Sequence, residues 1–244
     1  MVRIIKSRLF LSLKNYQKGV NFDEKAHEYH HRGRSLTSCT RLVASNFPKF
    51  DHNGVISTRL AAKRGITVKA LKAEWWAKAV LGTHVHEMAE LALYAGKVPV
   101  VAGLEKYSAS LETFLSEHSE VIHNLLFTEF MVWDAEFSVA GTADFLVWNP
   151  ETKCVDIWDW KTNTSITDSR ANFGKYGFGG LAKLADTNYW HYALQLSIYR
   201  YIIEKQGIKC GALKLVHLTE EGYKVIELPY LADEVYIILK GNQE

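Results

Sequence analysis

The chain has 244 residues, of which 48% are hydrophobic and 23% charged, and its formal net charge is +2. This length and composition suit one large domain with a single core, and no stretch is of low complexity. There is no run of about 18 apolar residues, so the sequence predicts no membrane span.

Basic residues gather at the start of the chain. Residues 1–22 hold five basic residues and no acidic one, which leaves 24 basic against 27 acidic residues in the remainder. A basic, acid-free segment is compatible with an organelle transit peptide. Its β-compatible residues, such as Ile4 and Ile5, also suit an ordinary first strand, and this is the interpretation we favour.

The three cysteines lie far apart, at Cys39, Cys154 and Cys210, without CxxC spacing. This pattern argues against a zinc ribbon, a four-cysteine iron–sulfur cluster and a disulfide framework. We therefore expect a reducing compartment.

Short elements are predicted over residues 23–44. His27, His30 and His31 form a histidine-rich run that is typical of a solvated turn between short strands, with metal binding as the alternative. The pair Thr37-Ser38 has the hydroxyl side chains of an N-cap and predicts a short helix through residue 44.

Helices are predicted over residues 57–80, as one or two segments, over 82–95 and over 104–124. Trp75 and Trp76 in the first region are expected to anchor the core. The helix over 82–95 has an apolar stripe at helical spacing, formed by Leu81, Val85, Met88 and Ala92.

The helix over 82–95 also carries candidate functional residues. His86 and Glu90 are four apart and share one face, and Gly82, one turn before His86, allows another backbone or a phosphate to come close. The segment starting at His86 resembles HExxH, but its last position is Glu90, so a second histidine ligand is missing and the pattern argues against a zinc peptidase.

Three strands are predicted over residues 126–133, 136–148 and 153–160. Asp144 lies near the end of the second strand. Asp159 and Lys161 end the third and, being two apart, point to the same side. Glu129 on the first strand is a candidate for the same site. Two carboxylates and a lysine are what metal-assisted hydrolysis of a phosphodiester needs, because carboxylates hold divalent ions and lysine positions or activates water.

Residues 162–189 are predicted to form a long loop in which aromatic and basic residues alternate, among them Arg170, Lys175 and Tyr176. This mixture suits stacking on unpaired bases and neutralising phosphates, although a surface loop with packed aromatics is the alternative.

The remaining elements are a helix over 190–206, a hairpin of strands 210–218 and 223–228, and a short helix over 231–240. Tyr192, Gln195 and Tyr199 fall on one face of the first of these helices. Gln195 needs hydrogen-bond partners if it is buried. It is expected to orient a carboxylate, bind substrate or bond to a strand.

Four motifs in this order resemble the PD-(D/E)xK nuclease superfamily and its RecB-like exonuclease branch, which includes the mitochondrial genome maintenance exonuclease and phage nucleases. They are Gly82-x-x-x-His86, Gly141-x-x-Asp144, Asp159-x-Lys161 and Gln195-x-x-x-Tyr199. The proline of the family name is absent, because Ala143 precedes Asp144.

The resemblance implies a mixed α/β (α+β) fold with a restriction-endonuclease-like core, in which helices flank a central mixed sheet. It implies one nuclease domain over 1–244, with an N-terminal extension over 1–80, a core over 81–228 and a terminal helix over 229–244. His86, Asp144, Asp159 and the Trp160 carbonyl would bind one or two Mg²⁺ or Mn²⁺ ions, and Lys161, with a pKa lowered by the nearby cations, would position or deprotonate water. Glu90, Glu129, Tyr192, Gln195 and Tyr199 would support the site or touch DNA.

The implied activity is a metal-dependent DNA exonuclease acting on single strands or DNA ends in replication, recombination or repair, with no iron–sulfur cluster. DNA and replication or recombination proteins are the expected partners. The expected location is the cytoplasm of a bacterium or of a phage-infected host, with the mitochondrial matrix as the alternative. A non-catalytic DNA-binding module and a structure-specific or site-specific endonuclease of the same fold are the competing functions.

Overall fold

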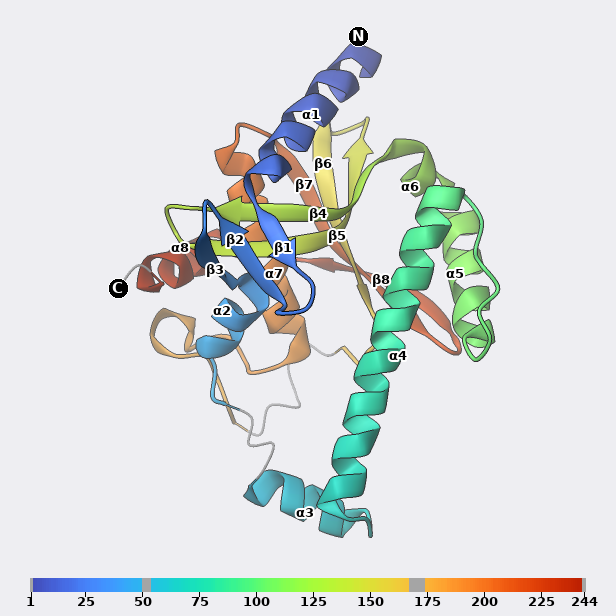
Figure 1. Ribbon diagram of the computed structural model, residues 1–244, viewed down its shortest axis with the longest axis vertical. Coiled ribbons are helices and arrows are strands. Elements are labelled where there is room, and N and C mark those ends of the chain that lie inside the picture. The colour runs from blue at the N-terminus through green and yellow to red at the C-terminus, as the bar shows by residue number, and fades with distance from the viewer. Residues whose placement is uncertain (1, 50–53, 167–173, 243–244) are drawn as a thin grey trace.

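A mixed eight-stranded sheet forms the centre of the protein in the computed structural model, which describes residues 2–49, 54–166 and 174–242 (Figure 1). The strand order is β1-β2-β3-β5-β6-β7-β8, and β4 pairs with β5. Two pairs, β3 with β5 and β6 with β7, are parallel and the others are antiparallel. The bounds are β1 Asn21–Asp23, β2 Glu28–His31, β3 Arg34–Ser38, β4 Leu125–Asp134, β5 Val139–Asn149, β6 Cys154–Lys161, β7 Cys210–Thr219 and β8 Gly222–Leu228.

Helices flank the sheet, as predicted, and two clusters of buried side chains lie between helices and strands. One cluster joins the sheet to α1 Val2–Tyr16, α2 Cys39–Ser45, α7 Asn188–Lys205 and α8 Ala232–Gly241. The other joins it to α4 Val68–Ala95, α5 Glu105–Glu117 and α6 Ser119–Asn124. Among the described residues, no helix is long and apolar enough to cross a membrane.

The N-terminal segment is a helix, α1, followed by the short 3₁₀ helix Gln17–Gly19, so the strand expected there is wrong. Leu9, Leu13 and Tyr16 recur at helical spacing and pack on the first cluster. Phe10 stacks on Phe127 of β4, with ring centroids 4.7 Å apart. Packing of this apolar stripe on the sheet outweighs the β-propensity of the individual residues.

Helix α4 is continuous over 28 residues, so the expected division near residue 81 is wrong. Thr67 caps its start by accepting a hydrogen bond from the backbone N–H of Ala70, and Gly96 ends it in the left-handed conformation at φ 62°. Trp76 is 71% exposed and is therefore no core anchor, while Trp75 is half-buried. The physical reason is that the first half of α4, with α3 Val55–Lys63, extends beyond the sheet (Figure 1).

The predicted helix over 104–124 is divided into α5 and α6 at His118, whose φ of −119° is not helical. The other predictions agree with the structure within a few residues. Ser38 caps α2 by accepting from the N–H of Arg41, and the strands and the last two helices lie where they are expected.

Strand β5 organises the centre of the sheet. Strand β4 pairs along one edge of β5, whereas the other edge is shared by β3, at residues 139–140, and β6, at residues 145–149. Residues 141–144 lie between these two partners. They include Gly141 and Asp144 of the sequence motif, so the motif lies where the neighbouring strands separate.

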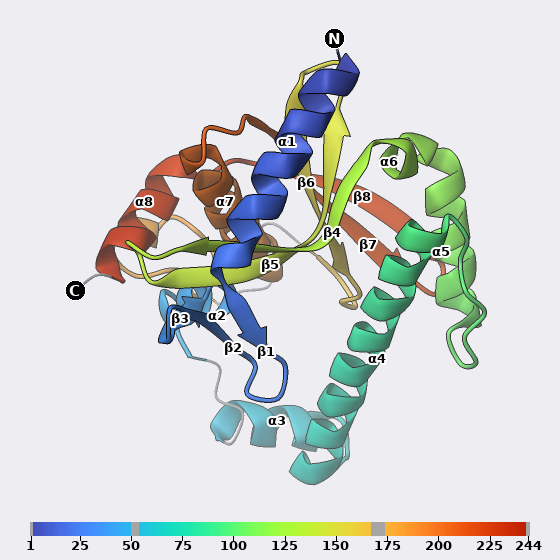
Figure 2. The same ribbon diagram turned by 45° about the horizontal axis from the view of Figure 1, so that its top comes forward.

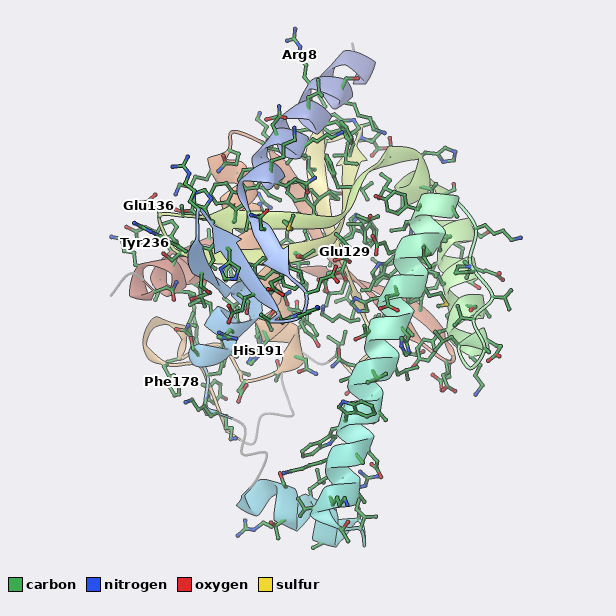
Figure 3. The ribbon with its side chains drawn as sticks, in the orientation of Figure 1. Arg8, Glu129, Glu136, Phe178, His191 and Tyr236 are labelled. Atoms are coloured by element: carbon green, nitrogen blue, oxygen red, sulfur yellow. The ribbon has the colours of Figure 1, made fainter. Side chains whose placement is uncertain are left out.

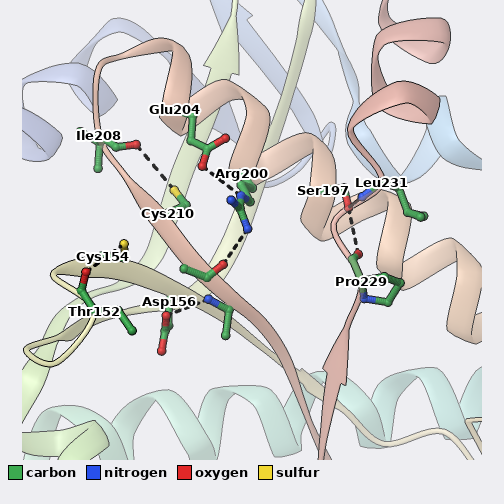
Figure 4. Close-up of polar contacts among 12 residues, drawn as sticks. Thr152, Cys154, Asp156, Ser197, Arg200, Glu204, Ile208, Cys210, Pro229 and Leu231 are labelled. Carbon is green, nitrogen blue, oxygen red and sulfur yellow. Dashed lines mark hydrogen bonds and ion pairs between the residues drawn. The ribbon is translucent and has the colours of Figure 1, made fainter.

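Helix α7 is held on β7 by polar contacts at its C-terminal end (Figure 4). Arg200 donates to Glu204 at 3.0 Å and to the carbonyl of Gly211 at 2.9 Å. Asp156 of β6 accepts from the N–H of Ala212 at 2.8 Å. These contacts fix α7, which carries Gln195 and Tyr199, relative to the strands that carry the acidic residues.

Candidate active site

An open cavity of about 1700 Å³ lies between the β1–β2 hairpin and α4, which face each other in Figure 2. Its lining comes from residues distant in sequence: Phe22 and His27 of the hairpin region, His86 of α4, Glu129 of β4 and Asp144 of β5, with others. The segment that follows β6, residues 162–164, also lines the cavity. Two of the four sequence motifs therefore line the cavity, and a third, Asp159-x-Lys161, directly precedes residues 162–164 of its wall.

Asp144 connects two of these motifs. Its Oδ2 accepts a hydrogen bond from the backbone N–H of Trp160 at 2.7 Å and lies 3.4 Å from Nδ1 of His86. The first contact replaces strand pairing, because the register of β5 with β6 ends at Phe145 opposite Trp158. The carboxylate thereby satisfies a backbone donor of the separating strand.

Asp159 and Lys161 form the second contact of the site. They lie two apart on β6, and the ammonium group of Lys161 donates to Oδ2 of Asp159. Nζ of Lys161 also lies 4.6 Å from the centroid of the Tyr192 ring. The hydroxyl of Tyr192 donates to Oδ1 of Asn163 at 2.6 Å, so α7 holds the lysine against β6.

The carboxylates lie close enough to repel one another. Burial raises the pKa of Asp144 well above its usual range, and the charge of Asp159 raises it further. Burial also raises the pKa of Glu129 to about 7, with contributions from Glu90 and Asp159. Lys161, as a nearby positive charge, opposes the rise in the pKa of Asp144.

The pKa of Lys161 depends on two opposing effects in this structure. Burial lowers its pKa, but Asp159 and Asp144 outweigh that effect and raise the pKa to about 12. Two carboxylates therefore set the pKa of the ammonium group in this structure, whereas the lowering expected beside bound cations stays a prediction for the metal-bound site. A lysine that keeps its proton is suited to hold a water molecule or a phosphate oxygen by hydrogen bonds and charge, and unsuited to remove a proton.

Helix α4 supplies His86 and Glu90 to the cavity wall. Burial, and then the charge of Lys161, lower the pKa of His86 to about 4, so the imidazole is neutral at pH 7 and able to act as a ligand. Glu90 accepts from the hydroxyl of Thr128 at 3.3 Å. A Cβ at Gly82 would lie 3.0 Å from Oγ1 of Thr162, so the glycine allows the chain after Lys161 to approach α4.

Glu129 lies in a strained stretch of β4. Its φ is +45°, which is rare for a residue other than glycine. Its neighbours Thr128 and Phe130 pair with Phe145 and Ala143, so Glu129 stands across from Asp144. Figure 3 shows Glu129 between the sheet and α4. Backbone strain of this kind gathers at functional sites, and no sequence signal indicates it.

Gln195 and Tyr199 of α7 contact each other, and Nε2 of Gln195 donates to the hydroxyl of Tyr199 at 2.8 Å. The Tyr199 ring packs on Gly141, which links the fourth motif to the second. Both residues line a smaller cavity of about 380 Å³ with Thr142 and Tyr29, whose hydroxyls lie 2.9 Å apart. Gln195 and Tyr199 therefore lie at the smaller cavity and are not among the residues that line the main one.

The long loop does not bring its described aromatic and basic residues to the main cavity. Tyr176 forms an isolated bridge with Ala185, and neither Tyr176 nor Lys175 is among the residues that line the cavity. Phe178 donates its backbone N–H to the carbonyl of Asn46, at the end of α2. Arg170 lies outside the described residues.

The histidine run lies only partly in a turn, because His27 belongs to the β1–β2 turn whereas His30 and His31 belong to strand β2. Nδ1 of His31 lies 2.6 Å from the carbonyl oxygen of Gly19, and its ring stacks on Trp133 at 4.2 Å. His30 lies 3.5 Å from Glu28. His27 is the member of the run that lines the main cavity.

Sequence reasoning missed several residues of the cavity wall. Thr162, Asn163 and Thr164 line the cavity and directly follow Lys161. Their place next to this motif was the feature of the sequence that could have indicated them. Lys78 of α4 donates to Oγ1 of Thr164 at 3.3 Å and joins the first half of the helix to the site.

The donor set suits a hard divalent cation, because carboxylate oxygens and an imidazole are ligands of Mg²⁺ and Mn²⁺. Within residues 2–49, 54–166 and 174–242, however, no three His, Cys, Asp or Glu side chains converge as a metal cluster. His86 and Asp144 are in place, whereas Asp159 is paired with Lys161. The crowded acidic groups nevertheless fit a bound cation, which would relieve their mutual repulsion.

No protein-family model and no curated protein matches this sequence. Among solved structures, the crystal structure of SSO0001 is 16% identical with a TM-score of 0.42, and the match covers 96% of this chain and 83% of that one. A structure named "Putative exonuclease", from Eubacterium rectale, is 17% identical with a TM-score of 0.40. That match covers 59% of this chain and 53% of the other. Both scores are low, so neither likeness bears on the chemistry of this site.

Proposed function

We propose that this protein is a metal-dependent DNA nuclease of the PD-(D/E)xK type, most similar to the RecB-like exonuclease branch. The observation that carries the proposal is the meeting of three motifs at Asp144. Its carboxylate contacts His86 of α4 and the backbone of Trp160, next to the Asp159–Lys161 pair. The order of four motifs in the sequence and the meeting of three of them in space are independent pieces of support.

Each residue then has a role that follows from its surroundings. Asp144, Asp159 and His86, with the carbonyl of Trp160, would hold one or two Mg²⁺ or Mn²⁺ ions. The bound metal would supply Lewis-acid stabilisation of the phosphodiester and of the hydrolytic water. Lys161, with its raised pKa, orients that water or a phosphate oxygen as a cation.

The open cavity supports a polymeric substrate. It extends from the β1–β2 hairpin past His86 to the β7–β8 turn, so a strand can lie across the acidic residues. DNA ends or single strands are the proposed substrates. Replication, recombination or repair proteins are the proposed partners.

The test uses DNA labelled at either end, as single strands and as duplexes, with Mg²⁺, Mn²⁺ or EDTA. Wild-type protein is expected to release label only with metal, and Lys161→Ala is expected to release none. Lys214→Ala is the matched control, because Lys214 lies on the neighbouring strand near Asp156, at 3.8 Å, and does not line the cavity. It should cleave at the wild-type rate.

Cleavage by Lys161→Ala at the wild-type rate would refute the assignment of the site. Binding of DNA without cleavage by the wild type would instead favour a non-catalytic DNA-binding module. Internal cuts at defined structures or sequences, in place of stepwise loss from one end, would favour the endonuclease alternative.

A further inference from the structure

Helix α3 and residues 68–80 of α4 form an arm that extends beyond the sheet (Figure 1). Its own small core includes Ala61 and Leu71, and an ion pair of 2.8 Å between Arg64 and Glu74 joins its two helices. From residue 72 to residue 84 the side chains of α4 are exposed or half-buried. The arm is thus a packed substructure with a large solvent-exposed surface.

The arm is strongly basic. Residues 55–80 contain six basic residues and one acidic residue, Glu74, which Arg64 already neutralises. The basic side chains are exposed: Arg59, Lys63, Arg64, Lys69, Lys72 and Lys78. The cavity beside the arm has the opposite character, since Glu87, Glu90, Glu129 and Asp144 line it. A polyanion matches both surfaces, because a metal held by the acidic cavity can bind one of its phosphates while the basic arm neutralises the phosphates along its length.

An exposed indole lies on this basic surface. Trp76 is 71% exposed, which is unusual for the side chain with the largest apolar area. At ~100° per residue, Lys69, Trp76, Thr83 and His86 fall within a sector of about 100° around α4. Thr83 and His86 line the cavity, so the same face of the helix continues from the arm into the site.

We infer that the arm binds single-stranded DNA next to the cleavage site, with Trp76 stacked on an unpaired base and Lys69 near the phosphates. This inference rests on the proposed nuclease function. A base exposes its face for stacking only when it is unpaired, which is why the indole specifies a single strand. Ten residues separate Trp76 from His86, or about 15 Å of helix at ~1.5 Å per residue. That distance is equivalent to about four stacked nucleotides at ~3.4 Å each.

The first experiment measures the Kd of a fluorescein-labelled oligothymidylate of about 12 nucleotides, a length within the site sizes of single-strand binding proteins. Trp76→Ala is expected to raise the Kd by about 10-fold, and Trp76→Phe by less. Tyr236→Ala is the matched control and should leave Kd unchanged, because Tyr236 is an exposed aromatic residue of α8 located away from the arm (Figure 3). An unchanged Kd in Trp76→Ala would overturn the inference.

Salt dependence tests the phosphate contacts. Lys69→Ala should reduce the slope of log Kd against log salt by about 0.7, the value for one phosphate contact on a single strand. Lys97→Ala, an exposed lysine beyond the other end of α4, should not change the slope. Equal slopes for Lys69→Ala and the wild type would remove Lys69 from the contact.

Substrate length separates this inference from the proposed function. If the arm binds the strand, the loss of kcat/KM in Trp76→Ala grows as the substrate is lengthened past about four nucleotides. A folding defect would lower kcat/KM equally at every length. Normal cleavage by the wild type with no length-dependent loss would refute the arm alone, whereas no cleavage by the wild type would refute the nuclease itself.

Discussion

Gly141 and Tyr199 are in direct contact across β5 and α7, and a Cβ at Gly141 would lie 2.6 Å from Cε1 of the tyrosine ring. The glycine of one motif therefore provides the space that the tyrosine of another fills. The same ring accepts a hydrogen bond from Gln195 through its hydroxyl. The contact connects the helix motif to the strand that carries Asp144.

Gly141→Ala is expected to destabilise the protein, because the added methyl group must displace a buried ring. Overpacking of this kind costs about 1–3 kcal/mol of the free energy of unfolding. Urea denaturation measures the change. Gly241→Ala is the control, since a Cβ there meets no described atom within 4 Å, and it should be neutral or slightly stabilising. Equal stability of Gly141→Ala and wild type would contradict the contact.

Asp144→Asn should separate activity from stability. The amide oxygen can still accept from the Trp160 N–H, but the negative charge beside Asp159 is lost. We expect cleavage to fall by about 1000-fold, the scale of losing one electrostatic group of an active site. The Tm in EDTA should stay equal or rise, because a buried like-charge contact is removed. A large fall in Tm would mean that Asp144 is chiefly structural.

Tyr192 is expected to position Lys161 without taking part in the reaction. Removal of the ring in Tyr192→Leu should lower kcat by about 10-fold, the lower range for groups that orient catalytic residues. Tyr192→Phe keeps the ring under the ammonium group and should retain most of kcat, although it loses the hydrogen bond to Asn163. An equal loss of kcat in both variants would show that the hydroxyl group of Tyr192, and not its ring, accounts for the effect.

His191 predicts a dependence of stability on pH. Burial lowers its pKa below the ordinary value of 6.5, although Asp186, 2.9 Å away, raises it. The unfolded chain therefore binds a proton more readily than the folded protein does. Its stabilising contribution is present above about pH 6.5 and is lost as the pH falls through and below that value.

The comparison of wild type with His191→Gln isolates this contribution. The Tm of the wild type relative to the variant should fall as the pH is lowered from about 7.5 to about 5.5. His191 lies at the start of α7, against Phe47 and apart from the acidic site, so metal ions should not alter the result (Figure 3). A constant Tm difference across this range would contradict the shifted pKa.

Contacts between residues close in sequence could be predicted from the periodicity of strands and helices. Asp159 and Lys161, two apart on a strand, were expected on one side and are in contact. Gln195 and Tyr199, four apart on a helix, were expected on one face and are hydrogen-bonded. The two tryptophans on α4 illustrate the limit, since hydrophobicity alone placed Trp76 in the core while the length of the helix carries it beyond the sheet.

The sequence alone determined the order of most elements, because alternation and helical spacing are local properties of the chain. It also indicated the residues that carry the proposed chemistry. Tertiary structure decided which of them meet: His86 reaches Asp144 across 58 positions, whereas Lys175 and Tyr176 lie outside the main cavity. It also set the raised pKa of Lys161 and the strain at Glu129. These depend on burial and on charges brought together by packing, which local sequence patterns do not specify.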